Sequence, residues 1–73
     1  MRYDRSASTP LTPREVEVLT HLALGKSNPN IARDLGIAVK TVQNHLNHIL
    51  SKVVIPEWAD HRVYLALWYS NDR

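Results

Sequence analysis

Two helix patterns separated by only three residues constrain the fold of this chain more than any other feature. Asn28 and Pro29 form a helix start signal, and apolar residues recur at helical spacing from there to Gly36. A second, longer helical pattern starts at Val39, so the connection consists of residues 36–38. A short helix, a turn that contains glycine and a longer helix form the helix-turn-helix arrangement. The chain is therefore predicted to be all-α.

The longer helix is predicted over residues 39–52, and its two faces differ in character. Apolar residues fall on one side of a helical wheel, and the other side holds polar residues without a carboxylate. A face exposed only to water more often mixes both signs of charge, and DNA phosphates repel carboxylates. The composition of the polar face therefore favours a nucleic-acid surface. Its residues are Lys40, Gln43, Asn44, Asn47, His48 and Ser51.

A first helix is predicted over residues 13–24. Thr12 is a suitable N-cap, Pro13 suits the first helical position, and Glu15 completes a capping box. Gly25 is a natural left-handed terminator just beyond the last turn. This helix precedes the helix-turn-helix unit and is expected to pack on it.

A last helix is predicted over residues 61–69, with Asp60 as its N-cap. It is apolar almost all round, and a terminal helix in a chain of 73 residues cannot bury every face against its own domain. One side is therefore expected to contact a second copy in a homodimer; the alternative is a helix packed on its own domain with an aromatic ring exposed. Trp58 and Trp68 are expected to anchor the core or an interface. The predicted dimer contacts are Tyr64, Leu67 and Trp68.

Length and composition predict one small domain over residues 11–70. The polar residues 1–10 are predicted to be a linker or mobile tail, and a native linker and an artificial leader fit them equally. The chain has no cysteine, which excludes disulfides and thiolate sites. No apolar run approaches the ~20 residues that span a bilayer. The predicted location is therefore the cytoplasm, without a membrane partner.

The residue inventory argues against an enzyme and against a metal site. The chain offers no nucleophile with an adjacent base, no paired carboxylates and no glycine-rich phosphate loop. His45 and His48 lie three residues apart without an acidic or cysteine companion, and His21 and His61 belong to other helices. No catalytic residue, metal ligand or cofactor is therefore expected. The net charge of +2 permits nucleic-acid binding without requiring it.

A series of residues along the chain matches one family pattern. They are Leu11 to Glu15, Glu17 to Leu19, Gly25, Ser27, Asn28, Ile31, Ala32, Leu35 to Ile37, Lys40 to Val42, His45, Ile49 and Lys52, with a looser match at Arg62, Val63 and Ala66. On these residues the chain resembles the LuxR-type helix-turn-helix domain, the effector domain of NarL/FixJ-like response regulators and of quorum-sensing receptors. The resemblance implies a tetrahelical domain without a wing, whose third helix reads double-stranded DNA and whose fourth helix dimerises on inverted half-sites. It also implies a bacterial transcription regulator, of a two-component system or a related type, bound at the nucleoid and preceded by a receiver or ligand-sensing domain.

The resemblance also implies which residues contact DNA. Base contacts in this family usually come from the positions of Gln43, Asn44 and Asn47. Their amides combine a donor with an acceptor, which matches the N6 and N7 edge of adenine in the major groove and predicts adenine-containing sites. The predicted phosphate contacts are Lys40 and Thr41 at the entry to the third helix, Ser27 and Asn28, for which local capping is the alternative, and His48 and Ser51.

The chain departs from the family pattern in four features. Ala38 replaces the usual Ser or Thr cap of the third helix. Gln43 stands where the family commonly has a lysine, and Asn30 stands where it commonly has an acidic residue. The connection before Arg62 is several residues longer than usual. A missing cap costs about 1 kcal/mol of helix stability. The absent cap at Ala38, the missing lysine at Gln43 and the low net charge of +2 keep an alternative function open, a protein-interaction module that binds DNA weakly or not at all. A sigma-factor promoter-recognition domain would seldom carry such an apolar last helix.

Overall fold

The computed structural model describes residues 11–71, with side chains over residues 11–70. This part of the chain forms four helices and no strand: α1 Pro13–Ala23, α2 Asn28–Leu35, α3 Val39–Lys52 and α4 His61–Asn71. The all-α, four-helix prediction is confirmed. None of the helices in this range is both long and apolar enough to cross a membrane. The predicted linker 1–10 lies outside the described residues.

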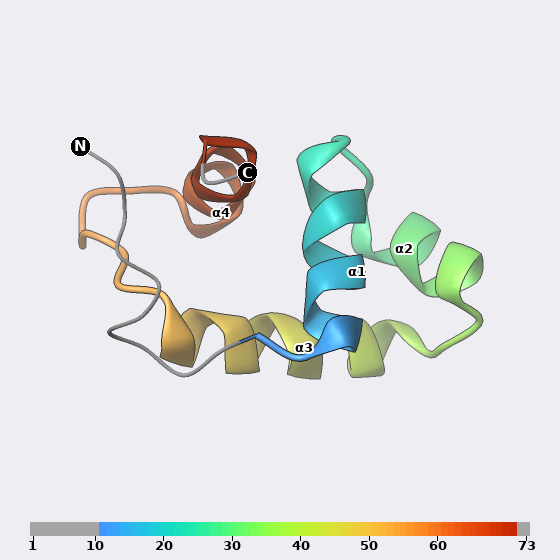
Figure 1. The fold of residues 1–73 in the computed structure, drawn as a ribbon. Helices are drawn as coiled ribbons and strands as arrows, with labels where there is room; N and C mark the ends of the chain where they lie inside the picture. Colours follow the sequence, from blue (N-terminus) through green and yellow to red (C-terminus); the bar gives the residue numbers. More distant parts are fainter. Residues whose placement is uncertain (1–10, 72–73) are drawn as a thin grey trace.

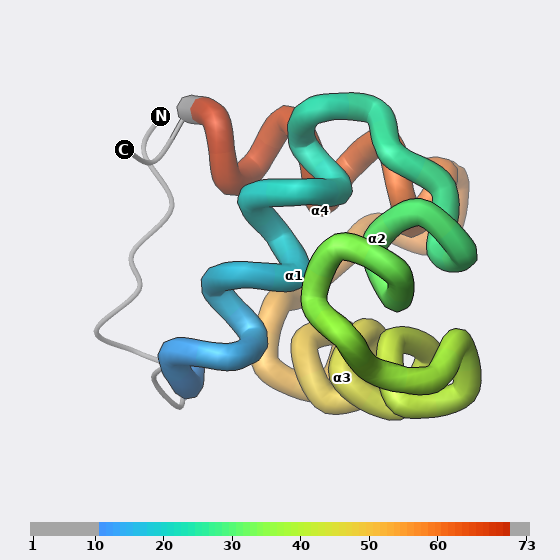
Figure 2. Tube along the Cα trace, turned by 90° about the vertical axis from the view of Figure 1, so that its right-hand side faces the viewer, coloured from blue at the N-terminus to red at the C-terminus, as the bar shows by residue number. Residues whose placement is uncertain are grey.

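The other three helices are arranged around α1, which contacts each of them. Figure 1 shows α3 lying across the base of the molecule, with α1 standing on it and with α2 and α4 on opposite sides of α1. Figure 2, turned by a quarter, again places α3 at the lower edge, below the other helices. Both views therefore leave the lower side of α3 uncovered by any other helix of residues 11–71.

The start of α1 has the predicted capping box. The backbone N–H of Glu15 donates to Thr12 Oγ1 at 3.1 Å, and the backbone N–H of Thr12 donates to Glu15 Oε1 at 2.9 Å. The helix ends at Ala23, one residue before the predicted end, and Gly25 then adopts a left-handed φ of 87°. A side chain is rarely tolerated in that conformation, which explains the glycine.

The start of α2 corrects the sequence-based prediction by one residue. Ser27, not Asn28, is the N-cap: its backbone is extended and its side chain accepts a 3.4 Å hydrogen bond from the backbone N–H of Asn30. Asn28 is the first helical residue and Pro29 the second. Pro29 fits there because the first N–H groups of a helix have no partner within it. Gly36 ends α2 in a left-handed conformation with φ 68°.

Helix α3 has the predicted bounds and lacks a side-chain cap. Its N-cap is Ala38, with extended backbone and no hydrogen bond from the side chain. Because the alanine side chain has no acceptor, the first N–H groups of α3 receive no hydrogen bond from the N-cap side chain.

The core lies between α1 and α3 and is closed by α2 and α4. The most deeply buried side chains come from all four helices: Val18, Leu19, Ile31, Val42, Ile49 and Leu65. Helix α4 begins after Asp60, whose Oδ1 accepts from the backbone N–H of Val63 at 3.0 Å, as predicted for its cap. The helix continues to Asn71, two residues beyond the predicted end.

The two tryptophans have opposite environments. Trp68 is only 8% exposed and belongs to the core, whereas Trp58 is 85% exposed in the connection between α3 and α4. Trp68 therefore takes the core position that was one of its two predicted roles, whereas for Trp58 only the predicted role at an interface stays open. Trp58 lies on a turn rather than on a helix face that packs against α1, so nothing in residues 11–70 covers its ring.

Candidate nucleic-acid interface

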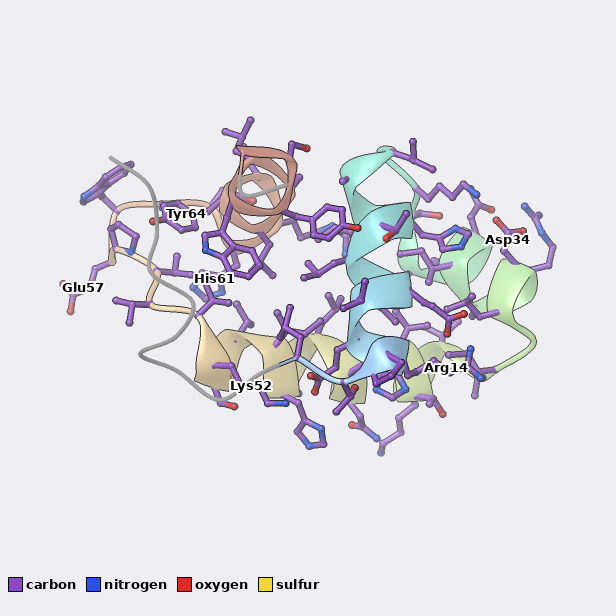
Figure 3. All side chains as sticks on the ribbon, viewed as in Figure 1. Arg14, Asp34, Lys52, Glu57, His61 and Tyr64 are labelled. Atoms are coloured by element: carbon purple, nitrogen blue, oxygen red, sulfur yellow. The ribbon has the colours of Figure 1, made fainter. Side chains whose placement is uncertain are left out.

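The outer side of α3 carries the residues predicted to read bases. Gln43, Asn44 and Asn47 are exposed, while Val42 and Leu46 on the opposite side are buried. Helix geometry explains this separation, because side chains spaced three and four residues apart share one face. Figure 3 shows side chains from α3 extending downward, away from the rest of the molecule.

The predicted phosphate contacts of α3 flank this face. Lys40, His48 and Ser51 are exposed, and Thr41 is half-buried at the first turn. The hydroxyl of Ser51 donates to the backbone carbonyl of His48 at 2.6 Å, so its proton is used within the helix. Ser51 must rotate before it donates to a phosphate, whereas Lys40 needs no such change.

A buried ion pair fastens the start of α1 to the end of α3. Lys52 Nζ lies 2.8 Å from Glu15 Oε1, and the two side chains are 17% and 4% exposed. Burial raises the pKa of Glu15, but hydrogen bonds from Lys52 and from the Thr12 backbone, with the charges of Lys52 and His48, outweigh it and leave that pKa below its ordinary value. The carboxylate is therefore charged, paired and withdrawn from solvent, and it leaves the α3 face without an uncompensated negative charge.

Sequence patterns did not predict this pair. They assign Glu15 its role in the capping box, which the structure confirms, but the partner on α3 lies 37 residues away. The only sequence signal is a basic residue in the last turn of α3, where it also complements the helix dipole.

An exposed ion pair lies at the start of α1. Arg14 Nη1 donates to Glu17 Oε1 at 3.1 Å, and both side chains are more than two-fifths exposed. Figure 3 shows Arg14 near the end of α1 that stands on α3. An exposed pair of this kind contributes about 0–1 kcal/mol, so Arg14 can exchange Glu17 for another anion at little cost.

The connection before α2 is held by contacts within the protein. Lys26 Nζ donates to Asp34 Oδ2 at 2.8 Å and lies 3.0 Å from His21 Nδ1. The hydrogen bond from Lys26 lowers the pKa of Asp34, and the charges of Lys26, Arg33 and His21 act in the same direction. The charge of Lys26 is therefore compensated by Asp34.

Asn28 has a partner that the sequence did not indicate. Arg62 Nη1 donates to Asn28 Oδ1 at 2.6 Å, and Arg62 Nη2 donates to the backbone carbonyl of Lys26 at 2.9 Å. Asn28 is half-buried and Ser27 exposed, so both predicted phosphate contacts lie at the surface of the α2 start. Local capping, the alternative for both residues, is present at Ser27, whose side chain caps α2. The contact of Asn28 is instead with Arg62, 34 residues away in the chain.

The predicted dimer contacts do not share one environment. Leu67 is 58% exposed and Tyr64 is half-buried, but the buried Trp68 offers a partner almost no surface. Its ring packs inside the chain because it lies one turn from Leu65 on the inner side of α4. Val63, four residues before Leu67, is equally exposed at 58% and was not predicted. The exposed apolar strip of α4 therefore consists of Val63 and Leu67.

Comparison with known proteins identifies the class to which this fold and surface belong. Residues 9–64 match the model of the bacterial regulatory proteins of the luxR family. The chain therefore belongs to the LuxR family of bacterial regulatory proteins.

Curated relatives match the chain over 54 residues, or 74% of its length. The chain is 43% identical to the transcriptional regulatory protein LiaR of Bacillus subtilis and to the CsgBAC operon transcriptional regulatory protein of Escherichia coli. It is 41% identical to the response regulator protein VraR of Staphylococcus aureus. The matched segment covers 25% to 26% of each relative's own length. No solved structure is significantly similar to the chain.

Proposed function

We propose that this domain binds duplex DNA at specific sequences and regulates transcription, with α3 in the major groove. The observation that carries the proposal is the outer face of α3, which is exposed, polar and without a carboxylate. A major groove admits an α-helix, and phosphates on both sides of it would repel acidic side chains. Similarity to proteins named as transcriptional regulators supports the same function.

Base reading is assigned to Gln43, Asn44 and Asn47. Each exposed amide can donate to adenine N7 and accept from the adenine N6 amino group at the same time. A bidentate contact of this kind contributes about 1–3 kcal/mol of discrimination against the wrong base. Adenine-containing half-sites are therefore the expected targets.

Phosphate contacts are assigned to the two ends of the helix-turn-helix unit. Lys40 and Thr41 lie in the first turn of α3, where helix N–H groups favour an anion. Ser27 and Asn28 lie at the start of α2, and the remaining assigned contacts, His48 and Ser51, lie further along α3. Contacts of this kind position the protein and carry no sequence information.

The regulator is proposed to act as a homodimer in which α4 meets its counterpart. The exposed strip of Val63 and Leu67, with the edge of Tyr64, is the surface available for that contact. The matched relatives are about four times as long as the segment they share with this chain, and one is named a response regulator. The length and the name support an N-terminal receiver or ligand-sensing domain beside this one. The domain over residues 11–70 is proposed to work in the cytoplasm.

Fluorescence titration of labelled duplexes tests the proposal. The wild-type chain is expected to bind a duplex selected from a random pool more tightly than the pool itself, and its affinity is expected to fall with salt by about 0.9 log units per phosphate contact and log unit of salt. Asn44→Ala is expected to lose roughly tenfold or more on the selected duplex and little on the pool. Glu57→Ala, in the connection before α4, is the control and is expected to bind like wild type.

A protein-interaction module is the second candidate function. The exposed Trp58 favours it, because tryptophan is a common anchor of protein interfaces, and so does the uncapped start of α3. Equal and weak binding to every duplex by wild type and Asn44→Ala would support this candidate and contradict specific DNA reading.

A further inference from the structure

Arg62 of α4 donates hydrogen bonds to the residues on both sides of the α2 N-cap. Arg62 is the second residue of α4, and its guanidinium reaches Asn28 Oδ1 at 2.6 Å and the Lys26 carbonyl at 2.9 Å. These partners flank Ser27, the N-cap of α2, and lie 34 and 36 residues from Arg62 in the chain. The planar guanidinium suits this arrangement, because its parallel N–H groups donate to two acceptors at once.

The contact with Arg62 also fixes which way the Asn28 amide points. A guanidinium has donors and no acceptor, so it must face the carbonyl oxygen of the amide. The NH2 group of Asn28 is consequently directed away from Arg62. Asn28 therefore offers donors to its surroundings, and a phosphate oxygen, which accepts hydrogen bonds, is a suitable partner.

The charges around this position favour an anion as well. The first turn of α2 has no acidic side chain, and the N-terminus of a helix carries a partial positive charge. Arg62 adds a full positive charge beside it, and both of its partners are uncharged groups. A cation at a helix N-terminus is unfavourable by itself, so an anion bound there would relieve the repulsion.

We propose that Arg62 is a positioning residue for DNA binding, which orients the Asn28 amide so that its donors meet a DNA phosphate at the start of α2. This inference rests on the proposed function, and it adds that the position of α4 controls a contact made by the helix-turn-helix unit. A displaced α4 start would release Asn28 and weaken binding to every duplex, without changing the preferred sequence.

Four variants test the inference in the titration described above. Asn28→Ala and Arg62→Lys are each expected to lose roughly tenfold in affinity, on the selected duplex and on the random pool alike. The lysine keeps the positive charge but cannot donate to both acceptors as a planar guanidinium does. The dependence of affinity on salt concentration should therefore stay that of wild type. The double variant should bind no more weakly than Asn28→Ala, since both changes remove one contact. Arg33→Lys, at an exposed arginine of α2 whose pair is Asp34, is the matched control and should bind like wild type.

Asn28→Asp separates DNA binding from stability. A carboxylate at this position still accepts from Arg62, so thermal unfolding should be unchanged or slightly raised, while phosphate repulsion should weaken binding beyond the loss in Asn28→Ala. In the free protein, NMR relaxation of the Asn28 side-chain NH2 group should report a rigid amide in wild type and a mobile one in Arg62→Lys. The NMR measurement needs no DNA.

The outcomes distinguish this inference from the function on which it rests. If Arg62→Lys binds like wild type, or if the losses in the two single variants multiply in the double variant, Arg62 does not act through Asn28 and only this inference fails. If wild type binds every duplex equally and weakly, the proposed DNA-reading function and this inference both fail. Reduced affinity with a rigid Asn28 amide in Arg62→Lys would also contradict the positioning role.

Discussion

At the scale of single residues, Glu15 connects more of the structure than any sequence pattern indicates. Its carboxylate accepts from the Thr12 backbone at the start of α1 and from Lys52 at the end of α3. One oxygen thus serves the capping box and the contact between the two helices that form the core. Because these partners lower the pKa of Glu15, its charged form contributes to the stability of the fold.

Replacing Glu15 tests this role. Glu15→Gln is expected to lower the free energy of unfolding at neutral pH by about 1–3 kcal/mol, because the contact with the half-buried Lys52 loses its charge on the α1 side. The pKa of Glu15 is lowered in the folded chain, so its stabilisation is full above the ordinary value of 4.5 and is lost as the pH falls through the folded pKa. Urea unfolding should therefore show wild type approaching the variant as the solution becomes acidic.

Glu17→Gln is the matched control for that experiment. Its carboxylate is exposed and paired with Arg14, so the change should cost no more than about 1 kcal/mol. Equal losses in the two variants at neutral pH would contradict the role assigned to Glu15.

Residue roles were predictable where the partner lies within one helical turn and not where it lies across the fold. The capping box joins Thr12 and Glu15, three positions apart, and was predicted. The contacts of Lys52 with Glu15 and of Arg62 with Asn28 join residues more than thirty positions apart. Only the packing of helices decides such contacts, and no local propensity encodes it.

At the scale of the elements, α3 has the most regular pattern and the weakest start. Its bounds, residues 39–52, were predicted correctly because a continuous apolar stripe marks them. Its N-cap is Ala38, so the first N–H groups have no side-chain acceptor. In contrast, the predicted N-cap of α2 was one residue too late. Ser27 and Asn28 are both good caps, and Pro29 fits the first or the second helical position.

A serine in place of Ala38 should strengthen the start of α3. The backbone of Ala38 already has the extended conformation of an N-cap, with φ −76° and ψ 153°. Ala38→Ser is therefore expected to raise the free energy of unfolding by about 1 kcal/mol. Urea unfolding measures the gain, with Ala38→Val as a control that cannot cap; equal stability of the two variants would contradict the account of this helix end.

At the scale of the whole molecule, α4 divides its apolar residues between the core and the surface. Leu65 and Trp68 are buried, whereas Val63 and Leu67 are exposed. An amphipathic pattern does not mark the boundary, because both sides are apolar, so the sequence allowed Trp68 either a core role or a dimer role, and the structure places it in the core. The exposed strip is the surface that the proposed dimer would bury.

Leu67→Glu tests the dimer. The side chain is exposed in the monomer, so the free energy of unfolding should change by about 0.5 kcal/mol or less at low protein concentration. A carboxylate in an apolar contact between two copies should abolish dimers in sedimentation velocity and remove cooperative binding to a duplex with two inverted half-sites. Val54→Glu, at an exposed valine outside α4, is the control and should leave the dimer and the cooperative binding unchanged. A wild-type chain that stays monomeric on such a duplex would contradict the dimer.

The central claim is that the outer face of α3 reads adenines in the major groove. It is tested most directly by titrating wild type and Asn44→Ala with a selected duplex in which single adenines are replaced by 7-deazaadenine, which lacks the major-groove N7 acceptor, or by 3-deazaadenine, which lacks the minor-groove N3 acceptor. At one adenine of each half-site, the 7-deaza change should weaken wild type roughly tenfold and leave Asn44→Ala unaffected, while the 3-deaza change should have little effect on either protein. Equal binding of wild type to all these duplexes, or a loss confined to the 3-deaza duplexes, would contradict the claim.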